Sequence, residues 1–220
     1  SQSNAVEEIL LDLQNNHPMN RLLEGDVGTG KTIVAIIAAY ISKLNGFKVL
    51  YMAPTEILAK QHHKTFKKFL KDHAKVAINT SSTKQKGDEW DILIGTHALL
   101  FDEYKNEIGM VIRDEQHRFG VEQRGKLIDL GKKGKTPHLL SMTATPIPRT
   151  LALTLYGDLS ISVRKEHPNK NRKITTKIVS EKQRKDAYKW IIDKNEPTFI
   201  VCPLIEESDS PMFENVKAAE

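Results

Sequence analysis

The sequence predicts an α/β fold built around a central, mostly parallel sheet. Short apolar runs alternate with stretches of helical periodicity, and several of the runs are continuously apolar. Continuous runs are expected for strands that are covered on both faces. A glycine-rich loop also follows the first run and precedes a long apolar segment, which is the strand–loop–helix order of a phosphate-binding unit.

The expected strands are Arg21–Glu24, Val49–Ala53, Ile92–Gly95, Met110–Ile112 and His138–Met142. Between the second and third of these runs, the periodicity predicts a helix from Glu56 to about Lys71, with lysines opposite an apolar stripe. Leu58, Phe66, Phe69 and Leu70 form this stripe. We expect both phenylalanines to pack in the core.

The composition changes near Ser160, and we expect two domains. Residues 1–162 would form the first lobe, 163–173 a polar, basic linker, and 174–220 the incomplete start of a second α/β lobe. In the second lobe we expect a strand at Ile174–Val179, a helix at Gln183–Lys194 and a strand at Thr198–Leu204. So few elements cannot cover both faces of a sheet.

Composition sets limits on function. The 220 residues are 39% hydrophobic and 28% charged, and they contain one cysteine, Cys202. No run suits a membrane span or a secretory signal, and a single cysteine fits a reducing cytoplasm, where it reads as a small buried residue rather than a nucleophile. The net charge of +5 permits nucleic-acid binding. The lysine-rich segments 60–86 and 164–189 are equally compatible with solvated helix faces.

The most specific motif is Gly25-Asp26-Val27-Gly28-Thr29-Gly30-Lys31-Thr32. It fits the G-x-x-x-x-G-K-[ST] phosphate loop, in which glycines bring backbone N–H groups close to phosphate oxygens. Lys31 would reach the β- and γ-phosphates, and the Thr32 hydroxyl would bind Mg²⁺. A nucleoside triphosphate with Mg²⁺ is therefore the predicted ligand.

A second motif, Asp114-Glu115-Gln116-His117, ends the strand near Met110–Ile112. Asp114 would hold Mg²⁺ and Glu115 would act as a general base on the attacking water. Many strands end in solvated carboxylates, but the position after a phosphate loop and a β/α unit favours the catalytic interpretation. Chemistry alone assigns no role to Gln116 or His117.

Three further strand ends carry polar residues, namely Ala53-Pro54-Thr55-Glu56, Gly95-Thr96-His97 and Thr143-Ala144-Thr145. The last of these could be a simple turn before a helix. In an open parallel sheet, however, ligands bind beyond the carboxyl ends of the strands. Five such ends on one edge are stronger evidence than any single motif.

Taken in order, these five segments resemble motifs I, Ia, Ib, II and III of superfamily 2 helicases. More narrowly, the chain resembles the RecG family of bacterial DNA helicases over nearly its whole length. The stretches that carry this resemblance are Gly25–Gly28, Asp114–Val121, Thr143–Thr150 and Cys202–Ser208. The resemblance implies a RecA-like P-loop NTPase lobe followed by the start of a second RecA-like lobe.

The resemblance also implies roles for single residues. Gln2 matches the glutamine that reads adenine, and Lys31, Asp114, Glu115, Gln116 and His117 match catalytic positions. Thr55, Glu56, Thr96 and His97 match positions near the DNA backbone. Thr143 and Thr145 match the motif that couples hydrolysis to lobe movement, and Arg149 lies near the DNA-facing side.

The implied function is an ATP- and Mg²⁺-dependent helicase or translocase that acts on branched DNA in repair and recombination. It would be a monomer in the bacterial cytoplasm, associated with the nucleoid and not with a membrane. The family's arginine-bearing motifs IV to VI and its wedge domain have no match in these residues, so we expect the chain to bind ATP but hydrolyse it poorly. Two alternatives stay open, a transcription-repair coupling translocase and a non-catalytic nucleotide-binding module.

Three features depart from the family pattern. Arg113 stands where relatives have an apolar residue. Since a buried arginine is costly unless paired, we expect it to reach an acidic partner or the edge of the sheet. The segment near Gly87 is shorter than in relatives, and the linker lacks their Pro-Pro-Gly-Arg run.

Overall fold

The computed structural model describes residues 2–83, 89–102, 104, 107–114, 130, 136–145, 159–164 and 175–201. The chain divides into two compact units, Ser1–Lys170 and Asn171–Glu220. The boundary between these units falls inside the segment expected to be a linker. No helix among the described residues has the length and apolarity that a bilayer span requires.

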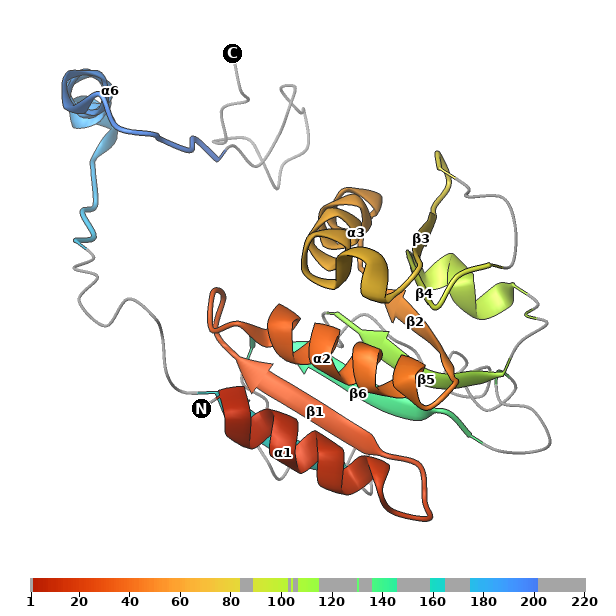
Figure 1. Ribbon diagram of the computed structural model, residues 1–220. Helices are drawn as coiled ribbons and strands as arrows, with labels where there is room; N and C mark the ends of the chain where they lie inside the picture. The colour runs from red at the N-terminus through yellow and green to blue at the C-terminus, as the bar shows by residue number, and fades with distance from the viewer. Residues whose placement is uncertain are drawn as a thin grey trace. The chain divides into compact units, whose positions relative to one another are not determined.

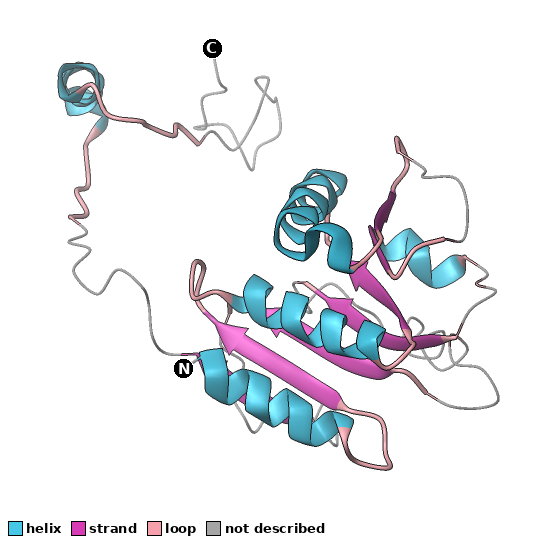
Figure 2. Ribbon diagram, viewed as in Figure 1, coloured by secondary structure: helices cyan, strands magenta, loops and turns pink. Residues whose placement is uncertain are grey.

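The first unit is a seven-stranded sheet in which every pair of neighbouring strands is parallel (Figures 1 and 2). The strand order is β3-β4-β2-β5-β6-β1-β7. The strands are β1 (Asn20–Gly25), β2 (Lys48–Met52), β3 (Val76–Asn79), β4 (Ile92–Gly95), β5 (Ile108–Arg113), β6 (His138–Thr143) and β7 (Ser160–Arg164). The predicted α/β class is therefore confirmed.

The five predicted strands are confirmed with small shifts at their ends, and two further strands occur. These are β3 and β7, the outermost strands of the sheet. Strand β7 pairs with β1, and the last pair of residues is Gly25 with Arg164. The first unit thus continues into the first residues of the segment 163–173.

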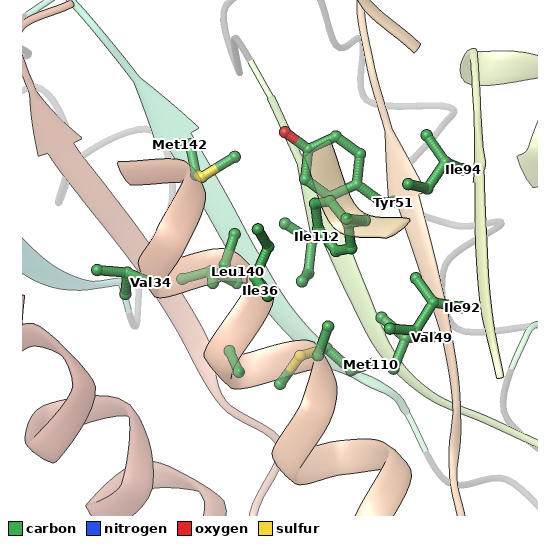
Figure 3. Packing of buried hydrophobic residues seen from close by; sticks show 14 of the residues in the cluster. Val34, Ile36, Val49, Tyr51, Ile92, Ile94, Met110, Ile112, Leu140 and Met142 are labelled. Atoms are coloured by element: carbon green, nitrogen blue, oxygen red, sulfur yellow. The ribbon is translucent and has the colours of Figure 1, made fainter. Parts of the chain in front are cut away.

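Three helices, α1 (Gln2–Leu13), α2 (Lys31–Leu44) and α3 (Glu56–Leu70), cover one face of this sheet (Figure 1). Side chains alternate along a strand, so Val49 and Tyr51 of β2 pack under these helices, while Leu50 and Met52 face the other side. Figure 3 shows the first of these clusters. On the other side, the short 3₁₀ helix η2 (His97–Phe101) contributes to the second cluster.

Helix α3 begins and ends within a residue of the predicted bounds. The Thr55 hydroxyl caps its N-terminus by accepting from the Leu58 N–H at 3.3 Å, as serine and threonine N-caps do. After Leu70 the chain continues as a short 3₁₀ helix, η1 (Lys71–His73). The buried stripe is Ala59, Phe66 and Leu70. The prediction that Phe69 packs in the core is wrong, because its side chain is 55% exposed, beside the stripe rather than on it.

Helix α1 had no counterpart in the predicted elements. It is held to the sheet by Arg21 of β1, which donates to Asp12 at 2.7 Å and to Glu8 at 3.0 Å. The same guanidinium donates to Ser162 of β7 at 2.7 Å. One buried cation therefore ties α1, β1 and β7 together.

The second unit is described over residues 175–201. It contains a 3₁₀ turn, η5 (Glu181–Gln183), and helix α6 (Arg184–Lys194), which confirms the predicted helix. Residues 175–180 and 196–201 form no strand, so both predicted strands are wrong over those residues. A strand needs a neighbour to satisfy its backbone groups, and the described part of this unit offers none.

Candidate functional site

The candidate site lies at the carboxyl edge of the sheet, where the polar segments after five strands meet. Because all strands are parallel, the ends of β1, β2, β4, β5 and β6 point the same way (Figure 1). Neighbouring ends are in register, since Met52 of β2 pairs with both Gly95 and Arg113. The convergence expected from the sequence is therefore present.

The glycine-rich loop joins β1 directly to α2. Gly28 and Gly30 both have φ near +83°, a conformation that costs glycine little. The Thr29 hydroxyl donates to the Asp26 carbonyl at 2.7 Å, and Nζ of Lys31 donates to the carbonyls of Gly25 and Asp26, the latter at 3.0 Å. Lys31 and Thr32 form the first turn of α2, where the helix dipole favours an anion.

Gln2 lies against this loop. A Cβ added to Gly30 would fall 2.0 Å from Nε2 of Gln2, so the amide of Gln2 occupies the space beside the Gly30 backbone. Gln2 is the first residue of α1, which the Arg21 network fixes to β1. A side chain from the start of α1 is thus placed next to the glycine-rich loop.

Asp114 follows β5 and continues its pairing with β2, because its backbone N–H donates to the Met52 carbonyl at 2.9 Å. Its carboxylate is mostly buried, with 15% of the side chain exposed. Oδ2 of Asp114 lies 3.1 Å from Nε2 of His62 on α3. Since a carboxylate only accepts, the imidazole N–H is the donor.

Strand β6 separates the two halves of this site. It pairs with β1 on one side and with β5 on the other, so the glycine-rich loop and Asp114 lie two strand spacings apart, roughly 10 Å. Thr143 ends β6 opposite Glu24. Its hydroxyl accepts from the Thr145 N–H at 3.1 Å and lies 3.0 Å from the Thr145 hydroxyl, so this threonine pair forms a local turn between the two motifs.

The segment after β2 forms a polar cluster at the start of α3. Glu56 pairs with Lys60 at 2.7 Å and also accepts from the Ser82 hydroxyl. The Lys60 hydrogen bond, helped by Ser82, lowers the pKa of Glu56 below its usual range. Glu56 is therefore held as an anion by Lys60, beside the Thr55 cap.

Gly95 ends β4 where the neighbouring backbone of β3 and the side chain of Leu99 approach closely. A Cβ at this position would lie 2.2 Å from the Asn79 carbonyl oxygen and 2.9 Å from Leu99. Thr96 occupies the N-cap position of η2 without a side-chain capping bond, and both Thr96 and His97 are half-buried. The backbone at Gly95 thus places these two residues at the same edge as Thr55.

Arg113 is buried at the end of β5, near the middle of the sheet. Its guanidinium donates to the Ser141 hydroxyl of β6, from Nη2 at 2.8 Å and from Nε at 3.3 Å. This hydroxyl is a polar partner on the neighbouring strand. The expectation of an acidic partner stays a prediction.

Four of the predicted site residues, Glu115, Gln116, His117 and Arg149, lie outside the described residues. So do Gly87 and residues 165–174. Sequence reasoning missed His62, although a signal for it exists. His62 lies between Ala59 and Phe66 at helical spacing, on the buried side of α3.

The fold and the glycine-rich loop define a class of protein. The family model for DEAD/DEAH box helicases matches residues 1–154, and the chain belongs to this family. Within superfamily 2 its sequence is of the RecG type, and its first unit is a RecA-like lobe.

The relatives support this placement. The chain is 48% identical to the ATP-dependent DNA helicase RecG of Aquifex aeolicus, over all of this chain and 29% of that protein. It is 44% identical to RecG of Bacillus subtilis, over 98% of this chain and 33% of that protein. A solved structure of RecG bound to a three-way DNA junction matches with a TM-score of 0.74 at 37% identity, over 93% of this chain and 29% of that one. The chain thus spans about a third of the length of these relatives.

Proposed function

We propose that this chain is the ATP-binding motor lobe of an ATP-dependent DNA helicase, joined to the start of a second lobe from residue 174. The whole protein would translocate on DNA and remodel branched structures such as replication forks and recombination intermediates. The relative solved with a three-way junction supports the choice of branched DNA. We further propose that the protein acts as a monomer in the bacterial cytoplasm, at the nucleoid.

The observation that carries this proposal is the placement of the glycine-rich loop and Asp114 on either side of β6. One intervening strand leaves room for a triphosphate and a cation between Lys31 and the carboxylate.

The residues present fit Mg²⁺ and ATP. The glycines at φ near +83° aim backbone N–H groups at an anion, and oxygen ligands from Thr32 and Asp114 suit a hard cation. Bound Mg²⁺ would neutralise developing charge on the transferred phosphoryl group. Gln2, beside Gly30, would select adenine.

The remaining roles follow the family pattern. Glu115 would take a proton from the attacking water, with Gln116 and His117 beside it. The DNA backbone would run past Thr55, Glu56, Thr96 and His97. Thr143 and Thr145 would couple hydrolysis to movement of the second lobe, and Arg149 would face the DNA. Arginine fingers contribute about 10³–10⁵ in rate, roughly 4–7 kcal/mol of barrier. We therefore expect the 220 residues alone to bind ATP and hydrolyse it poorly.

The first test is the binding of a fluorescent ATP analogue to this chain. Lys31→Ala should weaken binding at least tenfold, because it removes the cation at the phosphate loop. Lys43→Ala is the matched control, since this lysine of the same helix donates to the His73 carbonyl at 2.8 Å and lies over the Tyr40 ring, away from the glycine-rich loop. Equal affinity for the wild type and Lys31→Ala would overturn the proposal.

Catalysis is tested in the protein encoded by the complete reading frame. Glu115→Gln should abolish DNA-stimulated hydrolysis and leave ATP binding intact. A non-catalytic module would instead show no hydrolysis in the wild type. Anisotropy with a three-way junction and a linear duplex of equal length tests the branched substrate, for which we expect tighter binding of the junction.

A further inference from the structure

We propose that His62 is a positioning residue that fixes the Asp114 carboxylate for Mg²⁺ and links it to helix α3. This inference rests on the proposed function, because it takes Asp114 as a ligand of the cation. His62 belongs to none of the five motifs at the strand ends. Its role follows from two contacts of its side chain and from one feature of the neighbouring Tyr51 in the described structure.

The first contact is the hydrogen bond between Nε2 of His62 and Oδ2 of Asp114 at 3.1 Å. Both side chains are mostly buried, with 12% and 15% exposed. A donor at Oδ2 fixes the rotation of the carboxylate and leaves the other oxygen directed elsewhere. Groups that hold a metal ligand in this way commonly change metal affinity by 10–100-fold.

The second contact holds the imidazole itself. The His62 ring packs on the Tyr51 ring with centroids 4.9 Å apart and a tilt of 49°, and Tyr51 packs in turn on Phe66 at 5.0 Å. Tyr51 is fully buried on β2. The aromatic stack therefore restricts the His62 ring to the orientation that reaches Asp114.

The third feature is the Tyr51 hydroxyl. It is buried and has no hydrogen-bond partner among the described residues, and in Figure 3 it lies toward the Met142 end of the cluster rather than the Met110 end. Burial, together with the negative charge of Asp114, raises the pKa of Tyr51 well above its usual value. Tyr51 therefore supports the His62 ring by packing, and its hydroxyl makes no hydrogen bond within the described part of the site.

These contacts connect helix α3 to the Asp114 carboxylate through His62. His62 lies two helical turns after Thr55, the residue that caps α3 and for which we propose a DNA contact. A helix transmits a small displacement of its N-terminus along its length, so movement at Thr55 would move the imidazole against Asp114. DNA binding at one end of α3 would thereby adjust the cation site.

The experiment measures how much Mg²⁺ the chain needs to bind a fluorescent ATP analogue. His62→Ala should raise the half-saturating Mg²⁺ concentration about tenfold and leave binding in EDTA unchanged. His62→Gln, whose amide N–H can replace the Nε2 donor, should restore most of the loss. His63→Ala is the matched control, because its ring faces the Val76 carbonyl at 3.3 Å instead.

The outcomes are separable. Unchanged Mg²⁺ dependence in His62→Ala would overturn the inference, and so would equal losses in His62→Ala and His62→Gln at unchanged thermal unfolding temperature, because the hydrogen bond would then be irrelevant. If His62→Ala does not fold, the inference is tested with His62→Gln and Tyr51→Phe.

Tyr51→Phe keeps the ring stack and should shift the Mg²⁺ requirement less than twofold. A larger shift in Tyr51→Phe than in His62→Gln would overturn the inference. A wild type that binds no nucleotide would instead contradict the proposed function.

Discussion

The Arg113 guanidinium donates to the Ser141 hydroxyl across the β5–β6 pair at 2.8 Å, with both side chains buried. This contact joins the strand that ends in Asp114 to the strand that ends in Thr143. It lies one residue before the candidate cation ligand. The two central strands of the site are thus held together by a side-chain bond as well as by their backbone ladder.

A double-mutant cycle measures this contact. Arg113→Met, Ser141→Ala and the double variant should show a coupling of about 1.5–3 kcal/mol in the free energy of unfolding by urea, the range for hydrogen bonds to charged groups. Arg113→Met alone should cost about 1–3 kcal/mol, since it leaves the buried Ser141 hydroxyl without this donor. Thr65→Ala is the control partner, because Thr65 donates to the Gln61 carbonyl in α3 and should be additive with Arg113→Met. A coupling below about 0.5 kcal/mol between Arg113 and Ser141 would contradict the expectation.

Arg21→Met should loosen helix α1. The change leaves Asp12 without its closest cation and removes the bond to Ser162. Breaking a buried pair costs about 3–5 kcal/mol, and because Glu8 is 46% exposed we expect about 2–3 kcal/mol here. Hydrogen exchange should show the loss of protection concentrated in residues 2–13. Lys75→Met, which breaks an exposed pair with Glu89 at 3.1 Å, should stay within about 0.5 kcal/mol. Equal effects of the two variants would count against an anchoring role.

Acidification should destabilise the first unit through His138. Its Nδ1 accepts from the Met19 N–H at 2.9 Å, which requires the neutral ring, and burial lowers its pKa below the usual value despite Asp12. A lowered pKa means that the unfolded state binds the proton first as pH falls. The stabilisation is therefore complete above about pH 6.5, the unfolded pKa, and is lost as pH falls through the folded pKa. His138→Asn should flatten the decrease of the unfolding free energy between pH 7 and 5, and an unchanged slope would contradict this account.

Gly95→Ala should destabilise the fold by about 1–3 kcal/mol through overpacking. The added methyl would meet the Asn79 carbonyl oxygen at 2.2 Å, and two paired backbones cannot easily separate. Gly46→Ala is an informative control, since Gly46 has φ +84° but nothing within 4 Å. It should show the cost of a left-handed conformation alone, about 1 kcal/mol. If thermal unfolding shifts equally in both variants, crowding at Gly95 is not the cause.

The sequence predicted the inner strands and missed the outer ones for a physical reason. Met110–Ile112 of β5 is covered on both faces and must be apolar throughout, whereas β7 is an edge strand in which Ser160 and Ser162 alternate with apolar residues. An edge strand such as β7 buries fewer side chains, so its apolar pattern in the sequence is weaker. Strand β3 was missed for another reason, because its buried run from Val76 to Ile78 is only three residues long.

The parts of the site that lie within one short segment of the chain could be predicted from the sequence. Contacts between distant segments could not. The glycine-rich loop and the residues at strand ends could be located because parallel strands bring their carboxyl ends to one edge. The contact between His62 and Asp114 joins residues 52 positions apart, and only the packing of α3 on β2 creates it. The prediction that Phe69 is buried failed for a similar reason. A small rotation of α3 decides which side chains of its apolar stripe face the sheet, and the sequence does not determine this rotation.

The central position of β6 also sets the order in which the molecule can become functional. Strands β1 and β5 emerge from the ribosome before β6, yet they acquire their native spacing only when β6 pairs with both. Until residue 143 has been synthesised, the glycine-rich loop and Asp114 belong to separate sheet fragments with exposed edges. The candidate site therefore forms only with this late, long-range pairing, which is slow and leaves unpaired strand edges exposed to aggregation until it is complete.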